Sequence, residues 1–344
     1  MRRILAIRHD NNGDLTLLGP ALRALGAAAR VTLVCGPTGE GAARLLPGVA
    51  EVVVMRAEWI DAAPEPIERS RIEGDVATYA AAAADEAFVF TSFHQSPLPT
   101  ALLLRLAGVP AIAAISVDYP GALLDTRVRV PDNIHEVERA LTLVGARGYA
   151  LPAGDDGRLR YVPLPERFGE LPARYVAVQP GATVPARAWA PAKLRALVAE
   201  LEARGRRVVL VGSAGERELV RTVAADSGAL ELAGATTYAQ FASIVRDADA
   251  LVVGNSSGIH VASAVGTPVV TIFAPTIAPI RFAPWHVPFA MLGDREIACA
   301  GCRARACPIP GQPCTGTIEP ADVIEALERL TTYPVRSDRI EVPA

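Results

Sequence analysis

Residues 250–273 read ALVVGNSSGIHVASAVGTPVVTIF and contain one complete strand–helix–strand unit. Its two apolar runs, 250–253 and 269–273, are continuous rather than alternating, which is typical of parallel strands that are covered on both faces. Small and hydroxyl residues separate the first run from a helix expected at 260–265. Such a unit joins parallel strands by a right-handed crossover. This stretch therefore predicts an α/β protein built on an open parallel sheet.

The same alternation of strands and helices extends to both ends of the chain. Further strands are expected at 4–7, 31–35, 52–55, 88–91, 111–115, 175–179, 207–211 and 230–232. Further helices are expected at 20–29, 98–107, 191–204, 216–226, 238–246 and 320–330. Repeated units of this kind predict doubly wound sheets with helices on both faces.

Two domains are expected, because 344 residues exceed the size of roughly 250–300 residues at which a single hydrophobic core stops growing. The stretch 151–172 is rich in Pro and Gly, so we place the boundary there, with Rossmann-like domains at 1–160 and 161–344. The helix at 320–330 is also a candidate to pack back on the first domain. Ligands of such folds bind beyond the carboxyl ends of the strands, so we expect a site in a central cleft that the two domains face.

The composition argues against several classes of protein. The net charge is -3 and the basic residues are scattered, whereas a nucleic-acid-binding protein shows a basic stripe. The hydrophobic share is 51%, but much of it is Ala, and no run approaches the ~18 consecutive apolar residues that span a bilayer. The apolar run at the N-terminus is too short for the core of a signal peptide. We therefore expect a soluble, cytoplasmic protein that does not bind nucleic acid.

The first candidate site follows the first strand, where residues 8–14 read RHDNNGD. Gly13 suits a turn that another molecule approaches closely, and the carboxylate of Asp14 could accept a proton from a hydroxyl nucleophile. The alternative is that Asp14 only caps the next helix. The segment is not a G-x-G-x-x-G fingerprint, which argues against a dinucleotide cofactor and an oxidoreductase.

Three further candidate sites follow strands of the second half. PGAT at 180–183 lets a ligand approach the backbone, and Thr183 and Arg187 could hold a diphosphate, unless this is only a surface loop. GNSSGIH at 254–260 begins a helix whose N–H groups suit phosphate oxygens, or else serves as a helix cap with a structural His260. Glu216 ends VGSAGE at 211–216 and could bind a nucleoside or merely begin a helix.

In this order, these segments resemble the family 9 glycosyltransferases, whose best-known members are the ADP-heptose:lipopolysaccharide heptosyltransferases. The resemblance runs from about residue 4 to residue 330. Its most specific part is NSSGIHVASAVGTPVVTIFAPT, residues 255–276. It implies a GT-B fold in which the C-terminal domain binds the donor and the N-terminal domain binds the acceptor, and it implies inversion at the anomeric carbon.

The resemblance also implies roles for individual residues. Asp14 matches the proposed catalytic base, Thr183 and Arg187 match the diphosphate contacts, and Glu216 matches the nucleoside contact. The donor-binding turn of the family corresponds here to Asn255, Ser256, Ser257, Gly258 and His260. HEVER at 135–139 resembles an element near the acceptor, which makes Gly13, His135 and Arg139 the acceptor-side candidates. Asn255 replaces a common Asp and Arg187 a frequent Lys, so the sugar and the nucleotide stay open.

The implied function is inverting transfer of a sugar, with heptose from ADP-heptose as the first expectation, to a lipopolysaccharide core or a related glycan. The partners are then a nucleotide-sugar donor and a glycan or lipid-linked acceptor, with contact to the inner membrane surface left open and no cofactor expected. Two alternatives are a nucleotide-sugar epimerase of the same fold and a glycosyltransferase with another donor and a small-molecule acceptor. A non-catalytic sugar-binding protein has less support.

Four of the five cysteines gather in one Gly- and Pro-rich segment, as Cys299, Cys302, Cys307 and Cys314. The first spacing, C-x-x-C, fits tetrahedral zinc, but the later spacings are loose. Stable disulfides are rare in the cytosol. A structural zinc is therefore left open, and no metal is expected in the transfer reaction itself. Cys35 ends an apolar strand and is expected to be a small core residue.

Overall fold

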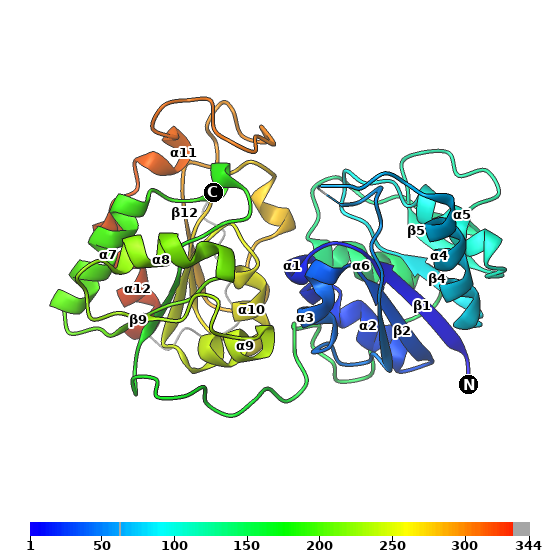
Figure 1. Ribbon diagram of the computed structural model, residues 1–344, viewed down its shortest axis with the longest axis horizontal. Helices are drawn as coiled ribbons and strands as arrows, with labels where there is room; N and C mark the ends of the chain where they lie inside the picture. The colour runs from blue at the N-terminus through cyan, green and yellow to red at the C-terminus, as the bar shows by residue number, and fades with distance from the viewer. Residues whose placement is uncertain (62, 333–344) are drawn as a thin grey trace. The chain divides into compact units, whose positions relative to one another are not determined.

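The computed structural model describes residues 1–61 and 63–332. The chain divides into two compact units, Met1–Val162 and a second unit that begins at Pro163 (Figure 1). This division lies inside the stretch 151–172 in which the boundary was placed. Each unit has its own parallel sheet and its own hydrophobic core.

The first unit has a six-stranded parallel sheet in the order β3-β2-β1-β4-β5-β6. Its strands are β1 (Arg3–Arg8), β2 (Arg30–Cys35), β3 (Glu51–Val54), β4 (Glu86–Val89), β5 (Ile112–Ile115) and β6 (Thr126–Val128). The order in which strands are added to the sheet reverses between β1 and β4, since β1 pairs with β2 on one side and with β4 on the other, all in parallel. Ligands of doubly wound sheets bind outside the carboxyl ends of the strands at such a point.

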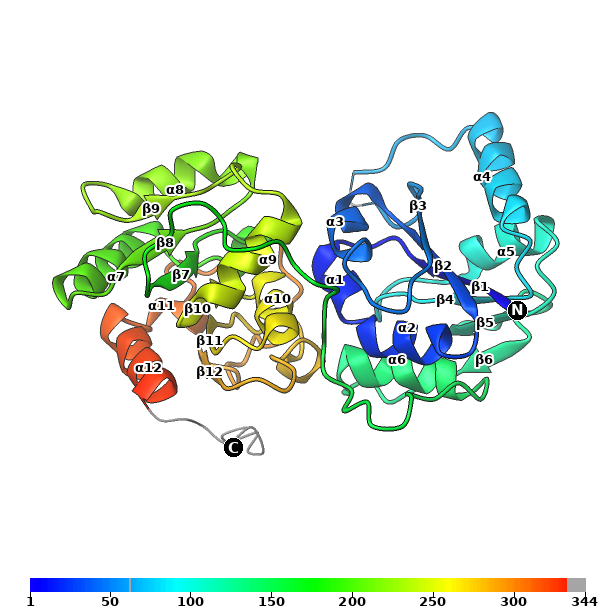
Figure 2. The same cartoon turned by 90° about the horizontal axis from the view of Figure 1, so that it is seen from below.

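Helices cover both faces of the first sheet (Figure 2). The helices are α1 (Asn12–Thr16), α2 (Gly19–Gly26), α3 (Glu40–Ala43), α4 (Arg69–Ala81), α5 (Leu98–Leu106) and α6 (Glu136–Gly145). α2 packs against α6, and α4 packs against α5. Leu104 of α5 and Leu143 of α6 are fully buried, as their places on the apolar faces of these helices require.

The second unit repeats the same order of strands in a second parallel sheet, β12-β11-β10-β7-β8-β9. Its strands are β7 (Val176–Gln179), β8 (Val208–Leu210), β9 (Leu230–Glu231), β10 (Ala250–Gly254), β11 (Val269–Ile272) and β12 (Phe289–Leu292). The switch point lies between β10 and β7, which pair directly. The strand–helix–strand motif expected at residues 250–273 is therefore present, as β10, α10 and β11.

The helices of the second unit are α7 (Pro191–Ala203), α8 (Arg217–Ala224), α9 (Tyr238–Asp247), α10 (Gly258–Val265), α11 (Pro313–Gly316) and α12 (Pro320–Thr332). Thr237 begins α9 with a capping box, because its side chain accepts from Gln240 N and the Gln240 side chain accepts from Thr237 N. The last helix, α12, belongs to the core of the second unit through Val323, Ala326 and Leu327. The expectation that this helix also packs back on the first domain stays a prediction.

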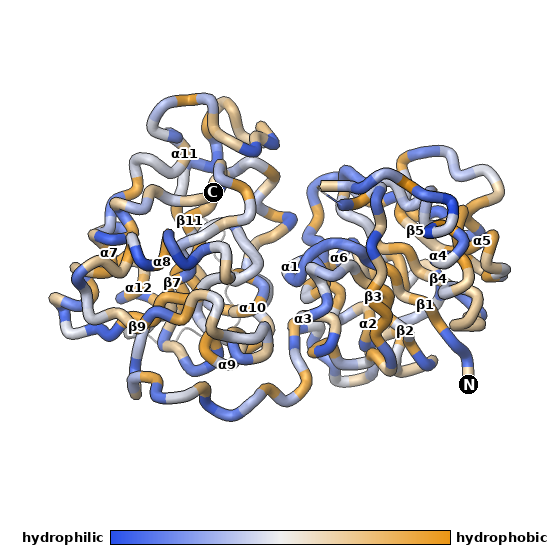
Figure 3. Tube along the Cα trace, viewed as in Figure 1, coloured by the Kyte–Doolittle hydropathy of each residue, from blue (hydrophilic) through white to orange (hydrophobic). Residues whose placement is uncertain are grey.

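Hydrophobic residues concentrate in the strands, while hydrophilic residues concentrate in loops and on outer helical surfaces (Figure 3). Within residues 1–61 and 63–332, no helix is long and apolar enough to cross a bilayer. All the strands expected from the sequence are present, with small shifts at their ends. The predicted class, two doubly wound α/β domains, is therefore confirmed.

Candidate active site

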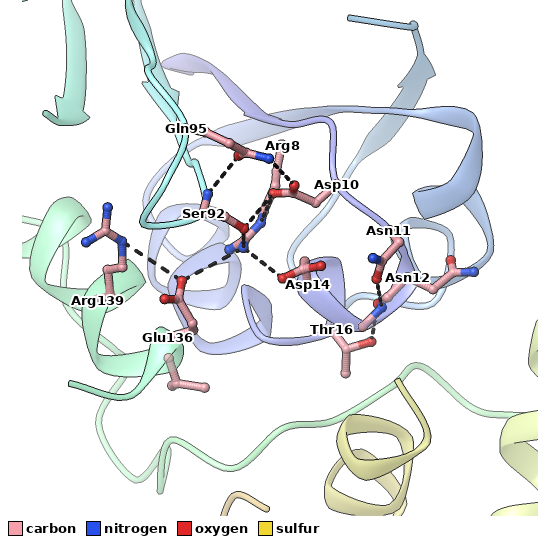
Figure 4. Close-up of polar contacts among 12 residues, drawn as sticks. Arg8, Asp10, Asn11, Asn12, Asp14, Thr16, Ser92, Gln95, Glu136 and Arg139 are labelled. Atoms are coloured by element: carbon pink, nitrogen blue, oxygen red, sulfur yellow. Dashed lines mark hydrogen bonds and ion pairs between the residues drawn. The ribbon is translucent and has the colours of Figure 1, made fainter. Parts of the chain in front are cut away.

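A buried arginine organises the loop after β1 (Figure 4). Arg8 is the last residue of β1, and its side chain is 2% exposed. Its Nε donates to Asp10 Oδ2 at 2.9 Å, and its Nη2 donates to Asp14 Oδ1 at 3.1 Å. Because the strand fixes the backbone of Arg8, these bonds hold both carboxylates at the carboxyl edge of the sheet.

The short helix α1 fixes the position of Asp14. Asn11 is its N-cap, and Asn11 Oδ1 accepts from Gly13 N at 3.1 Å. The next residue, Asn12, accepts from Ala42 N through Oδ1 at 2.7 Å and so ties α1 to α3. The alternative interpretation of Asp14 as a helix cap is therefore wrong, since Asn11 already has this role. Gly13 is buried beside Asp14 in the first turn.

The loop after β4 supports the same arginine from the neighbouring strand. Arg8 Nη2 donates to Ser92 Oγ at 3.3 Å. Gln95 Nε2 donates to Asp10 Oδ1 at 2.7 Å, while Gln95 Oε1 accepts from Ser92 N at 2.9 Å. β1 and β4 flank the switch point of the sheet, so the cluster lies where doubly wound folds bind ligands.

The helix α6 brings a third carboxylate and a second arginine. Glu136 Oε2 lies 3.8 Å from Arg8 Nη2 and 3.9 Å from Arg139 Nε, and the Glu136 side chain is fully buried. His135 caps α6, since its Nδ1 accepts from Val137 N at 3.2 Å. Of the acceptor-side candidates, Arg139 thus joins the cluster, whereas His135 is engaged as a helix cap.

The electrostatics of the cluster keep Arg8 charged. Burial would lower the pKa of Arg8, but the charges of Asp10, Asp14 and Glu136 raise it above its ordinary value. Among the three carboxylates, Asp14 has the most exposed side chain, at 15% against 10% for Asp10 and none for Glu136. Asp14 is therefore the carboxylate of this cluster that a substrate can approach most readily.

A small cavity lies behind the cluster and is lined by Arg8, Phe90, Glu136 and Arg139. It has room for about one water molecule. It is too small for a sugar, so the accessible face of the cluster is the side on which Asp14 is exposed.

In the second unit, Arg187 links the loops after β7 and β11. Arg187 lies in a short turn, Pro185–Arg187, and its Nε donates to Thr276 Oγ1 at 3.0 Å. Thr276 is 3% exposed, and Arg187 is half-buried. Thr183, in the same loop, is exposed. The guanidinium is thereby held at the carboxyl edge of the second sheet.

The turn from β10 into α10 contains buried polar atoms that have no hydrogen-bond partner within the described chain. They include Asn255 Nδ2 and Ser256 Oγ, and the neighbouring strand adds Gln179 Oε1. Leaving such a group unsatisfied costs about 1–3 kcal/mol, so their grouping at one sheet edge marks a position for a polar ligand. Gln179 is a candidate that the sequence analysis missed.

The first turn of α10 also offers backbone N–H groups. Ser256 N donates to Gly254 O and Ile259 N donates to Ser256 O, so Ser257 N and Gly258 N are the better candidates for a ligand. Gly258 permits the close approach of the Gln179 side chain, because a Cβ at position 258 would lie 2.3 Å from Gln179 Oε1. His260 is 5% exposed inside the helix, with its ring centroid 6.0 Å from that of Phe282. This environment favours a structural role for His260.

Glu216 lies beside the loop that carries Thr183. Its Oε2 accepts from Ser213 N at 2.6 Å, in a capping box that begins the turn before α8. A Cβ at Gly181 would lie 1.6 Å from Glu216 Oε1, so the carboxylate rests directly on this glycine. Glu216 therefore begins the helical segment, as one interpretation had it, and also borders the candidate donor site.

The cysteine-rich segment does not form a metal centre in the described residues, where no three His, Cys, Asp or Glu side chains are placed to bind one ion. Cys314 is buried, Cys299 and Cys307 are half-buried, and Cys302 is exposed. Burial raises the pKa of the Cys314 thiol, and the charges of Cys307 and Cys299 add to this effect. Cys35 is fully buried in β2 as expected, and burial raises its pKa to about 11.

The structure thus gathers the candidates into two groups. Asp14, Gly13 and Arg139 lie at the carboxyl edge of the first sheet, and the remaining donor-site candidates lie at the carboxyl edge of the second. Sequence reasoning missed Arg8, Asp10, Ser92, Glu136 and Thr276 as partners. A charged residue at the end of an apolar strand, as Arg8 is, was the available signal.

Comparisons with a family model and with curated proteins both point to the heptosyltransferases. A family model described as glycosyltransferase family 9 (heptosyltransferase) matches residues 95–312. Lipopolysaccharide heptosyltransferase 3 of Escherichia coli is 29% identical over 164 residues, which cover 45% of this chain and 46% of that protein. Lipooligosaccharide heptosyltransferase 2 of Campylobacter jejuni is 27% identical over 101 residues, 29% of this chain and 32% of that protein. The chain thus spans less than half the length of these curated relatives.

Solved structures share the fold over nearly the whole chain. A glycosyltransferase family 9 protein of Veillonella parvula has a TM-score of 0.77 at 16% identity, covering 96% of this chain and 97% of its own. The ADP-heptose heptosyltransferase II of E. coli has a TM-score of 0.74 at 22% identity, covering 96% and 99%. The E. coli heptosyltransferase WaaC, solved with ADP, has a TM-score of 0.70 at 18% identity, covering 95% and 99%. The fold is therefore the GT-B fold of heptosyltransferases.

Proposed function

Because the chain belongs to glycosyltransferase family 9, we propose that it transfers a sugar from a nucleoside-diphosphate donor to a hydroxyl group of a glycan, with inversion at the anomeric carbon. The observation that carries the proposal is the set of polar groups at the carboxyl edge of the second sheet, within the matched segment. There Arg187 is held by Thr276. The backbone oxygen of Arg187 would lie 2.9 Å from a Cβ at Gly254, and the two residues that follow, Asn255 and Ser256, have unsatisfied buried atoms.

The second unit is proposed to bind the donor. A guanidinium presents a planar fork of donors that matches phosphate oxygens, and the start of α10 adds Ser257 N and Gly258 N at the positive end of a helix dipole. Thr183 supplies a hydroxyl from the adjoining loop. We propose ADP-heptose as the first donor to test, since one structural relative was solved with ADP and with ADP-2-deoxy-2-fluoro heptose.

The first unit is proposed to bind the acceptor, with Asp14 as the catalytic base. Asp14 accepts the proton of the acceptor hydroxyl while the oxygen attacks the anomeric carbon on the face opposite the diphosphate. The bond between this carbon and the diphosphate oxygen breaks, and negative charge grows on the leaving group. Arg187 and the N–H groups of α10 stabilise this charge, because preorganised donors are most effective in a site from which water is excluded.

The acceptor is proposed to be a lipopolysaccharide core or a related glycan. The curated relatives are named for lipopolysaccharide and lipooligosaccharide, which supports this class of acceptor. A lipid-linked acceptor would bring the protein to the inner membrane surface. Co-sedimentation with vesicles that contain truncated lipopolysaccharide, against vesicles of phospholipid alone, tests this point directly.

The decisive experiment separates donor binding from transfer. Calorimetry with ADP, UDP, GDP and dTDP is expected to give selective binding of one nucleotide, weakened about tenfold or more by Arg187→Ala, because a charge-assisted contact to phosphate contributes about 1.5–3 kcal/mol. Asp14→Asn is expected to keep this affinity and to lose transfer by at least about a hundredfold.

Normal turnover in Asp14→Asn would rule out the assignment of the base. Epimerised nucleotide sugar in the absence of any acceptor would replace the transferase by an epimerase. Binding of a nucleotide other than ADP would keep the transferase and change the donor. The matched control is Asp132→Asn. Asp132 is an exposed carboxylate of the same unit outside the cluster, so this substitution should change neither the nucleotide affinity nor the rate of transfer.

A further inference from the structure

The cysteine-rich segment, residues 299–316, contacts both loops that carry the proposed diphosphate groups. Arg305 O accepts from Ala186 N at 3.0 Å, next to Arg187. Arg303 N donates to Thr276 O at 2.9 Å, and Gly301 N donates to Pro275 O at 2.7 Å. The segment therefore bridges the two loops that the hydrogen bond between Arg187 and Thr276 also connects.

The side chain of Gln312, in this segment, binds the backbone of the turn on both sides of Arg187. Gln312 Nε2 donates to Ala186 O at 2.9 Å and to Ala188 O at 3.4 Å. It also contacts Thr315 Oγ1 at 3.1 Å. Two carbonyl oxygens can only accept, so the amide nitrogen of Gln312 must face them. The side chain thus holds the backbone immediately before and immediately after the arginine.

The backbone of Gln312 is strained. Its φ of 45° and ψ of 67° lie in the left-handed region, which costs a residue with a Cβ about 1–2 kcal/mol. Neighbouring bonds maintain this conformation, because Thr315 N and Gly316 N both donate to Gln312 O. Glycine would adopt the same conformation without this cost, but it would not supply the amide group that reaches the turn.

We infer that Gln312 is a positioning residue for donor binding, which fixes the turn 186–188 so that Arg187 is presented to the diphosphate. Gln312 itself need not touch the donor. This inference rests on the proposed function, because it requires that Arg187 bind a nucleoside diphosphate. It also gives the cysteine-rich segment a role in the donor site that does not depend on whether its cysteines bind a metal.

The test compares Gln312→Ala and Gln312→Gly in the full chain by calorimetry with ADP. Both variants lack the amide, but only the glycine variant also relieves the backbone strain, so it remains folded if the alanine variant does not. Both are expected to weaken ADP binding about threefold to tenfold, since one or two neutral hydrogen bonds are lost. Arg195→Ala is the matched control, because Arg195 is an exposed residue of α7 in the same unit, and it should leave ADP binding unchanged.

The same substitutions in an Arg187→Ala background complete a double-mutant cycle. If Gln312 acts through Arg187, its removal there causes no further loss of affinity. Wild-type affinity in both Gln312 variants, or an equal loss with and without Arg187, would overturn the inference while leaving the proposed function intact. If the wild-type protein binds none of the nucleoside diphosphates tested, the proposed function and this inference both fail.

Discussion

Arg8 is a full positive charge inside the first unit, and it is surrounded by the carboxylates of Asp10, Asp14 and Glu136. Burying a charge costs several kcal/mol unless partners and hydrogen bonds compensate it. Here Ser92 Oγ and two direct carboxylate bonds provide this compensation, and Glu136 adds an ion pair at 3.8 Å. A nearby cation favours the ionised form of a carboxylate and a nearby anion disfavours it, so we expect the same charges to influence the protonation of the proposed base.

Substitutions of Arg8 and Asp10 are therefore expected to shift the pH profile of transfer in opposite directions. Arg8→Gln removes the cation beside Asp14, so the acidic limb of the kcat/KM profile should move to higher pH by about one unit or more. Asp10→Asn removes a competing anion, so the same limb should move to lower pH. Measuring kcat/KM between about pH 4 and pH 9 gives the position of the acidic limb for each variant.

Arg8→Gln also leaves buried carboxylates without their cation, and a loss of about 3–5 kcal/mol in the free energy of unfolding is expected. If that variant does not fold, Asp10→Asn still tests the idea. Shifts in the same direction for both variants, or none for Asp10→Asn, would show that the cluster does not control the base. The charged groups that face Arg8 are Asp10 and Asp14 from the loop and α1, and Glu136 from α6, which itself contacts Arg139.

At the scale of elements, continuous apolar runs predicted the strands well because parallel strands are buried on both faces. β6 reads TRV and is only half-buried, so it lacks the apolar signal of a central strand. β12 reads FAML and is also half-buried, and its short apolar run was not predicted as a strand. α4 was missed for a similar reason, since RSRIEGDVATYAA has only a narrow hydrophobic face, formed by Ile72, Val76 and Tyr79. The partners of Arg8 could not be predicted, because Ser92 and Glu136 are far from it in the sequence and reach it only through the order of the strands.

A second pair of elements is joined by Arg23 of α2 and Asp155, in the stretch before the domain boundary. Arg23 Nε and Nη2 donate to the two oxygens of Asp155 at 2.6 and 2.8 Å. The hydrogen bonds from Arg23 lower the pKa of Asp155 from 3.8 to about 2. This carboxyl group therefore contributes stability above its unfolded pKa, and the contribution is lost as the pH falls through about 2.

Asp155→Asn is expected to lower the free energy of unfolding at pH 7 by about 2 kcal/mol, since one pKa unit corresponds to about 1.4 kcal/mol. The difference from the wild type should begin to narrow below about pH 4 and close at about pH 2. Urea unfolding at a series of pH values measures it. The exposed Asp132→Asn serves as the control, and an equal difference at pH 7 and pH 3 would contradict this account.

At the scale of the whole molecule, the chain repeats one architecture, and each copy carries a different kind of group at its carboxyl edge. The first unit has carboxylates around a buried arginine, which suits proton transfer from a hydroxyl group. The second has a fixed arginine, a helix start and unsatisfied polar atoms, which suit a diphosphate. The residues themselves indicated a proton acceptor after the first strand and diphosphate contacts in the second half, whereas the assignment of acceptor and donor to the two domains came from the family resemblance.

The division of labour leads to a prediction about the second unit alone. Its sheet, its core with α12, and the bridge between Gln312 and the turn around Arg187 all lie after Pro163. A protein of residues 163–344 should therefore fold and bind ADP within about tenfold of the affinity of the full chain, because every proposed donor contact is present, and it should show no transfer, because Asp14 is absent. Circular dichroism and calorimetry measure the two properties, with residues 1–162 as the matched control that should fold but not bind ADP. If residues 163–344 fold without binding ADP while the full chain binds it, part of the donor site must come from the first unit, and the assignment of the donor to the second unit alone would be wrong.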